Sequence, residues 1–214
     1  MRAMSQPIID HRGPRFEALV RDCLEGLKRV FRAERGHIAL FPGSGTGAWE
    51  AAIVNTLSPG DRVLAVVNGF FSAGFARTAA AFGVEVERID VPYGAGVPAD
   101  QVEARLRADD AREIRAVLVV HNETSTGVTS NVPAVRAALD RAGHPALLLV
   151  DTVSSLASID FRLDEWGVDV ALTGPQKGLM LPPGMAILAV SERAVIASEK
   201  ATCPRSFWDW RPVL

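Results

Sequence analysis

Short apolar runs rich in β-branched residues recur along the chain, and their alternation with helical patterns most constrains the fold. Most of these runs are apolar throughout, which is typical of strands covered on both faces. Strands are predicted at residues 37–41, 62–67, 85–89, 116–120, 147–150, 168–172 and 186–190, and helices at 14–32, 45–57, 71–82, 99–108 and 132–142. This order predicts an α/β fold with a largely parallel sheet, in which ligands collect at the carboxyl ends of strands.

Composition excludes several classes of function. The 214 residues are 48 % hydrophobic and 22 % charged, with a net charge of -2, and the basic residues are scattered, so no nucleic-acid partner is expected. No apolar run approaches the ~18–20 residues of a membrane span, and the start at Met1 has no signal-peptide pattern. Cys23 and Cys203 lack metal-ligand spacing. We expect a reducing, cytoplasmic location, no metal, and Cys23 as a small core residue.

One lysine and one aspartate form the most informative pair. Lys177 lies in the Gly/Pro loop Thr-Gly-Pro-Gln-Lys-Gly after an apolar run, and Asp151 ends the apolar run Leu-Leu-Val-Asp. A pyridoxal-phosphate site needs both groups: an amine that forms a Schiff base with the cofactor aldehyde, and a carboxylate that keeps the pyridine nitrogen protonated. A solvated loop lysine and a helix-capping aspartate are the alternatives.

A glycine-rich turn supplies a candidate anion site. The segment Phe-Pro-Gly-Ser-Gly-Thr-Gly at residues 41–47 follows a predicted strand and opens a predicted helix. Ser44 and Thr46 offer hydroxyls, Gly45 permits close approach, and the helix N-terminus offers free amides and a favourable dipole. An ordinary strand-to-helix turn with a Ser or Thr cap is the alternative. The spacing matches neither the dinucleotide fingerprint nor the P-loop.

Three more segments could surround a cofactor ring. An aromatic residue in Asn-Gly-Phe70-Phe71-Ser could stack on the ring, although both phenylalanines could instead be helix core residues. Thr124, in His121-Asn-Glu-Thr-Ser-Thr-Gly, could hydrogen-bond the ring hydroxyl, and Val153 would pack on the opposite ring face. His121 could be a general base or a packed structural residue.

Taken together, these segments resemble the class V (fold type I) pyridoxal-phosphate aminotransferases, and most of all the serine–glyoxylate/alanine–glyoxylate branch. The matching stretches begin at Gly43, His121, Leu148 and Asp164 and occur in the family's order and spacing. The resemblance covers nearly the whole chain. It implies a three-layer αβα large domain of fold type I with a mostly parallel sheet.

The resemblance also implies roles for single residues. Lys177 and Asp151 correspond to the catalytic pair, the Schiff-base lysine and the partner of the pyridinium. The other positions are cofactor-binding: Ser44, Gly45 and Thr46 in the phosphate turn, Gln176 beside the phosphate, Thr124 at the ring hydroxyl, Val153 under the ring, and Phe71 where the family often has tryptophan.

The family's length implies a domain division. Its members are close to twice as long, so we expect residues 1–200 to form the cofactor-binding large domain and 201–214 to begin a connection to a small C-terminal domain. That domain carries the arginine that clamps the substrate carboxylate. The three aromatic residues of the tail, at 207, 208 and 210, are not expected to stay in water.

The implied activity is transamination of serine or alanine with glyoxylate, giving glycine and a 2-keto acid, in a homodimer. An aspartate–glyoxylate or pyridoxamine–pyruvate aminotransferase is an alternative. A non-catalytic, cofactor-binding fragment is another. A cysteine desulfurase is disfavoured, because that group has a histidine where this chain has Phe71 and a reactive cysteine that neither Cys23 nor Cys203 matches.

Overall fold

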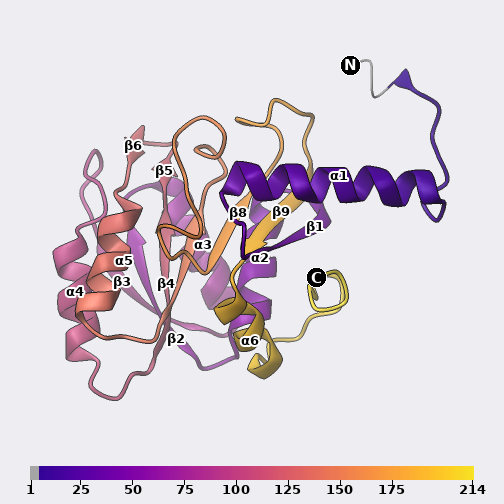
Figure 1. Ribbon diagram of the computed structural model, residues 1–214. Coiled ribbons are helices and arrows are strands. Elements are labelled where there is room, and N and C mark those ends of the chain that lie inside the picture. Colours follow the sequence, from indigo (N-terminus) through magenta and orange to yellow (C-terminus); the bar gives the residue numbers. More distant parts are fainter. Residues whose placement is uncertain (1–4) are drawn as a thin grey trace.

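A computed structural model describes residues 5–214, so Met1–Met4, the start of the expected domain, lie outside the described part (Figure 1). Its main feature is a seven-stranded sheet. The strands run in the order β1 (His37–Gly43), β9 (Gly184–Val190), β8 (Val170–Thr173), β7 (Leu147–Asp151), β4 (Ile114–Val120), β2 (Arg62–Val67) and β3 (Glu85–Asp90). Only β9 runs against the other strands, because it pairs antiparallel with both β1 and β8. The expected mostly parallel sheet is confirmed.

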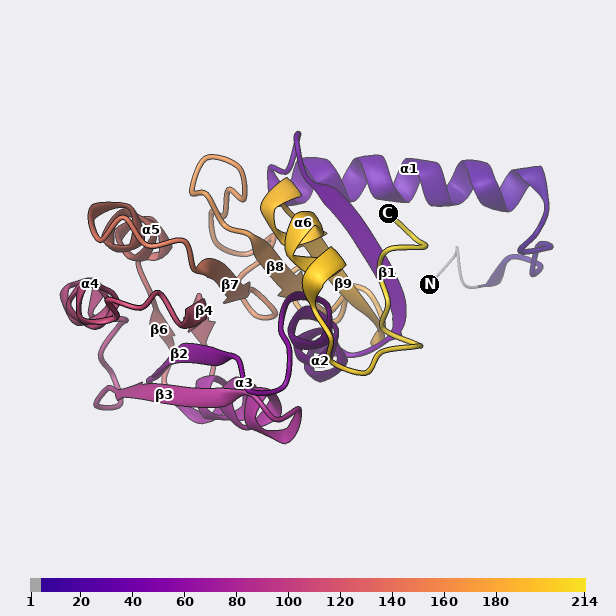
Figure 2. The same cartoon turned by 90° about the horizontal axis from the view of Figure 1, so that it is seen from below.

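Helices cover both faces of the sheet, as Figure 2 shows. One face packs against α1 (Pro14–Phe31), α4 (Ala99–Ala108) and α5 (Val132–Arg141), and the other against α2 (Gly45–Thr56), α3 (Phe70–Ala81) and α6 (Glu192–Lys200). Successive strand residues enter opposite cores, as Val117 and Leu118 of β4 do. This explains why the strands are apolar throughout, and it confirms the three-layer αβα class.

The predicted helices and strands are present, with ends that shift by one or two residues. Helix α6 and the small hairpin of β5 (Asn122–Glu123) and β6 (Val128–Thr129) were not predicted. The expectation that Cys23 is a core residue is wrong, because its side chain is exposed. Helix α1 projects beyond the sheet (Figure 1), and of its residues only Phe31 is buried.

The C-terminal tail docks against α2. Trp210 is fully buried, and the Asn55 side chain accepts a hydrogen bond from its amide at 3.2 Å and donates to the Trp208 carbonyl at 2.6 Å. Arg205 donates to the carbonyls of Val54 and Ser198. Trp208 is half-buried and Phe207 remains 59 % exposed, so of the three tail aromatics only Trp210 leaves water completely. Among residues 5–214 no helix is long and apolar enough to cross a membrane.

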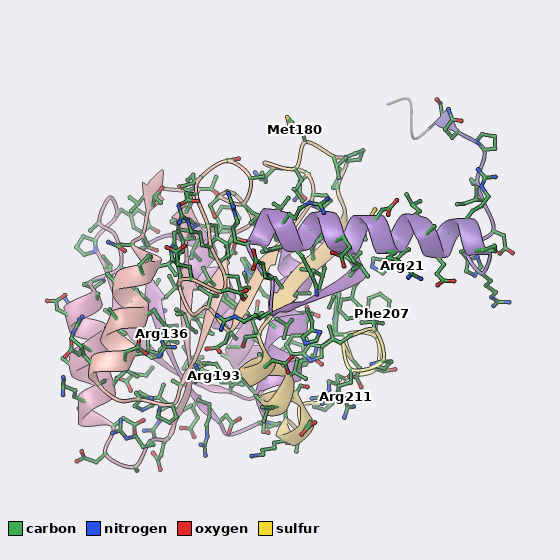
Figure 3. All side chains as sticks on the ribbon, viewed as in Figure 1. Arg21, Arg136, Met180, Arg193, Phe207 and Arg211 are labelled. Carbon is green, nitrogen blue, oxygen red and sulfur yellow. The ribbon has the colours of Figure 1, made fainter. Side chains whose placement is uncertain are left out.

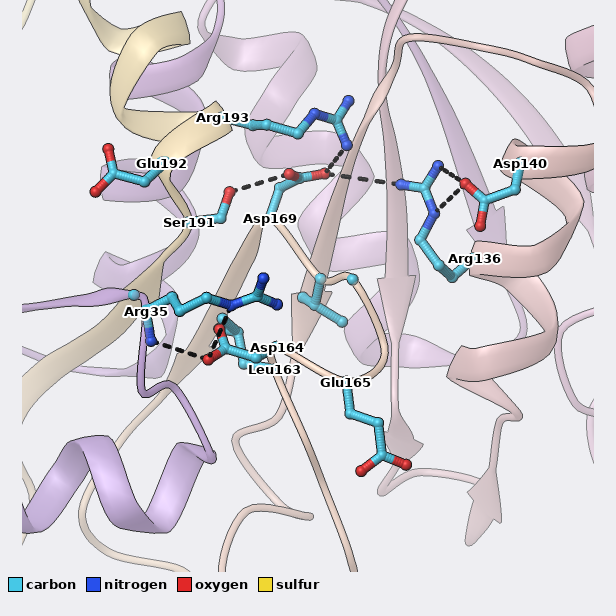
Figure 4. A pocket seen from close by; sticks show the side chains of 13 residues that line it. Arg35, Arg136, Asp140, Leu163, Asp164, Glu165, Asp169, Ser191, Glu192 and Arg193 are labelled. Carbon is cyan, nitrogen blue, oxygen red and sulfur yellow. Dashed lines mark hydrogen bonds and ion pairs between the residues drawn. The ribbon is translucent and has the colours of Figure 1, made fainter.

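A buried carboxylate ties several elements together where β8 begins (Figure 4). Asp169 is 2 % exposed and accepts hydrogen bonds from the Leu148 amide, the Ser191 hydroxyl and Arg193 at 2.9–3.2 Å. Arg136 of α5 lies 4.0 Å away. The side chains of this cluster border a cavity of about 450 Å³ that carries charges of both signs; the Leu148 amide lies outside its lining. Because its partners come from β7, α5 and the start of α6, we assign the Asp169 cluster to stability.

Replacing Asp169 by alanine should therefore lower the free energy of unfolding by about 3 kcal/mol, since one partner of a buried charge network is removed. Urea denaturation measures this loss. Asp140→Ala is the matched control: Asp140 also pairs with Arg136, but its side chain is 64 % exposed, so we expect a loss below about 1 kcal/mol. Equal losses in the two variants would contradict the anchoring role.

Candidate functional site

All nine predicted site residues line one cavity of about 240 Å³ at the carboxyl ends of the central strands. They are Ser44, Gly45, Thr46, Phe71, Thr124, Asp151, Val153, Gln176 and Lys177. The structure adds four residues that the sequence interpretation missed: Trp49, Val120, Asn122 and Ser154. Ligands in open α/β sheets bind at this position.

The amino end of α2 forms one wall of the cavity. Ser44 is the N-cap, and its hydroxyl accepts a hydrogen bond from the Gly47 amide at 3.2 Å. The capped-turn alternative is therefore correct as a description of Ser44, yet the amides of Gly45 and Thr46 have no hydrogen bond within the described chain. No acidic residue occupies the first turn. Two free amides at the positive end of a helix dipole favour an anion here.

Gly45 is required by close packing inside the cavity. A Cβ atom on this residue would lie 2.7 Å from a methyl carbon of Val153. Any side chain at position 45 would therefore displace Val153, which lines the same cavity. Behind the turn, a Cβ on Gly47 would lie 2.7 Å from the Trp208 ring, so the tail supports the turn from outside. Substitution at either glycine would move the amides that face the cavity.

Asp151 ends β7 and is only 4 % exposed. Its Oδ1 accepts a hydrogen bond from the Val153 amide at 2.7 Å, and its Oδ2 accepts one from Trp49 Nε1 at 2.6 Å. Burial raises the pKa of Asp151 to about 6; the nearby Glu123 carboxylate also raises it, while the two hydrogen bonds oppose the rise. No cationic side chain in the described residues pairs with this carboxylate. A cation in the cavity would restore its charge.

We predict that the Trp49 indole N–H resonance shifts with a midpoint near pH 6, because the carboxyl group that it contacts titrates there. The folded pKa exceeds the ordinary 3.8, so the folded protein holds the proton more tightly. The contribution of Asp151 to stability should thus be present below about pH 4 and be lost as the pH rises through about 6. NMR of the ligand-free protein measures the midpoint. Asp151→Asn should abolish it, and an unchanged titration would contradict the assignment.

The residues predicted to face a ring lie in three places around the cavity. Phe71, in the first turn of α3, is half-buried and lines the cavity, whereas its neighbour Phe70 is 61 % exposed. The alternative that places both in the helix core is therefore wrong for Phe70. Val153 is half-buried, and Thr124 is exposed at the rim, in the turn of the β5–β6 hairpin.

His121 is a packed structural residue. It does not line the cavity, its Nδ1 lies 2.9 Å from the Ser155 hydroxyl, and its ring contacts those of Phe161 and Trp166 with centroids 5.7 Å away. Burial lowers the pKa of His121 to about 4, although Asp160 opposes the shift. A neutral, buried imidazole outside the cavity does not act as its general base.

Lys177 lies on the loop between β8 and β9. Its side chain and that of Gln176 are exposed and line the cavity. The next residue must be glycine, because a Cβ on Gly178 would lie 2.2 Å from the Leu156 carbonyl oxygen. This contact presses the lysine loop against the segment that follows Asp151.

Within residues 5–214, no three His, Cys, Asp or Glu side chains are placed to hold a metal ion.

Comparison with known proteins agrees with this geometry. The sequence profile described as "Aminotransferase class-V" matches residues 3–202. The chain is 54 % identical to an L-aspartate–glyoxylate aminotransferase of Paracoccus denitrificans, over 98 % of this chain and 53 % of that protein. It is 44 % identical to a serine–glyoxylate aminotransferase of Arabidopsis thaliana, over 100 % of this chain and 53 % of that protein.

The fold of this chain is also similar to that of a solved aminotransferase structure. The alanine–glyoxylate aminotransferase of Nostoc sp. superimposes with a TM-score of 0.91 at 32 % identity, covering 99 % of this chain and 55 % of that one. The chain thus spans about half the length of the relatives that it matches.

Proposed function

The chain belongs to the class-V aminotransferase family, and we propose that it forms the pyridoxal-phosphate site of an aminotransferase that uses glyoxylate. One observation carries this proposal. An amine, a buried carboxylate without a cationic partner in the described residues and a helix N-terminus with free amides all border the same 240 Å³ cavity.

The donor set fits pyridoxal phosphate group by group. The amides of Gly45 and Thr46, the Thr46 hydroxyl and the Gln176 amide suit a phosphate. Asp151 suits a protonated ring nitrogen, and the Thr124 hydroxyl suits the ring hydroxyl. Phe71 and Val153 offer apolar surfaces for the two ring faces. When bound, this cofactor supplies an aldehyde for the lysine and a ring that accepts an electron pair.

Each of the two catalytic candidates, Lys177 and Asp151, would act through one group: the lysine amine and the aspartate carboxylate. Lys177 Nζ would attach the cofactor and, when free, carry a proton away from the Cα of the amino acid. Asp151 would remain ionised beside a cation, because the pairing offsets the burial that raises its pKa. Trp49 Nε1 and the Val153 amide would hold the carboxylate in place throughout.

For substrates we propose a small amino acid as donor and glyoxylate as acceptor, giving glycine and a 2-keto acid. Serine or alanine is supported by the serine–glyoxylate and alanine–glyoxylate relatives. Aspartate is the second candidate, supported by the 54 % identity to the Paracoccus protein. We place the substrate-carboxylate clamp outside residues 1–200, which we propose to be the cofactor-binding domain.

We also propose a homodimer in the cytoplasm. An apolar groove of about 730 Å³ runs between α1 and the lysine loop, and its lining includes the exposed Leu19 and Leu181. Met180 of the same loop points outward (Figure 3). A second copy of the chain would cover such apolar surface. Both cysteines are free thiols, which suits a reducing compartment.

Addition of pyridoxal 5′-phosphate to the purified protein tests the proposal. We expect a visible absorption band from the cofactor condensed with an amine, and then conversion of glyoxylate to glycine with serine, alanine or aspartate as donor. A coupled assay for glycine ranks the three donors. A band without turnover would favour the non-catalytic, cofactor-binding alternative, and the absence of a band would contradict the proposal.

A further inference from the structure

Glu123 is a fully buried carboxylate, 0 % exposed, that no Lys, Arg or His of residues 5–214 pairs with. Only hydrogen bonds compensate its burial. Its Oε1 accepts from the Ser125 hydroxyl at 2.6 Å and from the amides of Ser125 and Phe71 at 3.2 and 3.3 Å. Its Oε2 accepts from the Ser72 amide at 2.9 Å. Four donors therefore converge on one carboxylate.

These bonds fix the first turn of α3. The amides of Phe71 and Ser72 would otherwise lack partners at the helix N-terminus, and the Phe70 amide donates to the Ser125 hydroxyl at 2.9 Å. Gly69 is required here, because a Cβ on it would lie 2.3 Å from Glu123 Cγ. The β5–β6 hairpin and the start of α3 are thereby joined through a single side chain.

The group is held in its charged form. Burial by itself would raise the pKa of Glu123, but the hydrogen bonds from Ser125, Ser72 and Phe71 outweigh burial and bring it below the usual value. A negative charge at a helix N-terminus also interacts favourably with the helix dipole. Glutamine has the same shape but only one acceptor oxygen, so it cannot satisfy the donors on both sides.

We propose that Glu123 is a positioning residue for the cofactor site. It fixes the Phe71 ring, on α3, relative to the Thr124 hydroxyl, in the β5–β6 turn, and both groups line the cavity. Phe71 is bonded to Glu123 directly, and Thr124 lies between Glu123 and Ser125 in the chain. Glu123 itself does not line the cavity. This role rests on the proposed cofactor.

The test compares Glu123→Gln with Glu199→Gln, which removes an exposed carboxylate of α6. In the ligand-free protein, hydrogen exchange at the amides of Phe71 and Ser72 should accelerate about tenfold or more in Glu123→Gln, because a charged hydrogen bond is lost. With pyridoxal 5′-phosphate at saturation, the visible circular dichroism per bound cofactor should fall at least about twofold, because the ring is less firmly oriented. Glu199→Gln should change neither value.

Ser125→Ala keeps the Glu123 carboxylate and removes one of its donors. We expect smaller changes in hydrogen exchange and in visible circular dichroism, in the same directions. This variant replaces Glu123→Gln in the test if Glu123→Gln does not fold. Exchange rates within about twofold of wild type, or faster exchange with unchanged circular dichroism, would overturn the role of Glu123. A wild-type protein that shows no cofactor signal at all would instead contradict the proposed function, and the role of Glu123 would fall with it.

Discussion

Replacing Lys177 by alanine should abolish covalent attachment of pyridoxal phosphate and, with it, all transamination. Lys177 is the only amine among the residues that line the cavity. The free amides at the start of α2 and the buried Asp151 remain in the variant, so we expect the cofactor still to bind without a covalent link. Absorbance spectra before and after gel filtration measure the loss. Before filtration, we expect the band of the cofactor condensed with lysine to be absent. After filtration, we expect the non-covalently bound cofactor to have been removed.

Lys200→Ala is the matched control, since Lys200 ends α6 and does not line the cavity. It should retain the band and the rate of the wild-type protein. The lysine assignment would be contradicted if Lys177→Ala kept a covalently bound, coloured cofactor. A loss of the band in both variants would point to a general loss of the fold, which far-UV circular dichroism would detect.

Replacing Asp151 by asparagine should leave the covalent link intact but slow the conversion of the amino acid by about 10²–10³-fold, the usual effect of removing one preorganised electrostatic group. The carboxylate is the only charged partner in the cavity for a protonated ring nitrogen, and it is positioned by Trp49 and Val153. Asparagine cannot provide the charge, and the NH2 of its side-chain amide, a donor, would face one of these two donors. Single-turnover kinetics with serine measures the rate.

Asp100→Asn, on the exposed first turn of α4, controls for the loss of one negative charge and should keep the wild-type rate. A rate within about tenfold of wild type would show that the ring nitrogen does not depend on this carboxylate, and the electron-acceptor role would be abandoned.

The layered fold was predictable because burial on both faces leaves a signal in the sequence. Runs such as the apolar residues of β4 and β7 have few polar positions, and strand–helix alternation then limits the topology. Helix α6 lacks such a signal, since it is short and largely polar and has only Ala194 and Ser198 buried. Cys23 was misplaced because a helical pattern does not reveal how far α1 extends beyond the sheet.

The grouping of the candidate site residues around one cavity was predictable where single segments carry recognisable chemistry, as with Lys177, Asp151 and the turn around Ser44. Contacts between distant segments left no such signal. Trp49 and Asp151 are 102 positions apart, and their hydrogen bond follows only from the packing of α2 on β7. Glu123 was missed for the same reason: its donors at Phe71 and Ser72 belong to α3. For the contact with Asp151, the Trp49 indole was a usable signal in the sequence, because it is an uncommon group beside a glycine-rich turn.

Borohydride trapping followed by peptide mapping tests the central claim most directly, because reduction makes the link between a lysine and the pyridoxal aldehyde permanent. The chain has only three lysines, Lys28, Lys177 and Lys200, so peptide mapping can assign an adduct to one of them. We predict that the reduced adduct is found on the peptide that contains Lys177 and on neither of the others. An adduct on Lys28 or Lys200, or no adduct on any peptide of a cofactor-treated protein, would contradict the account.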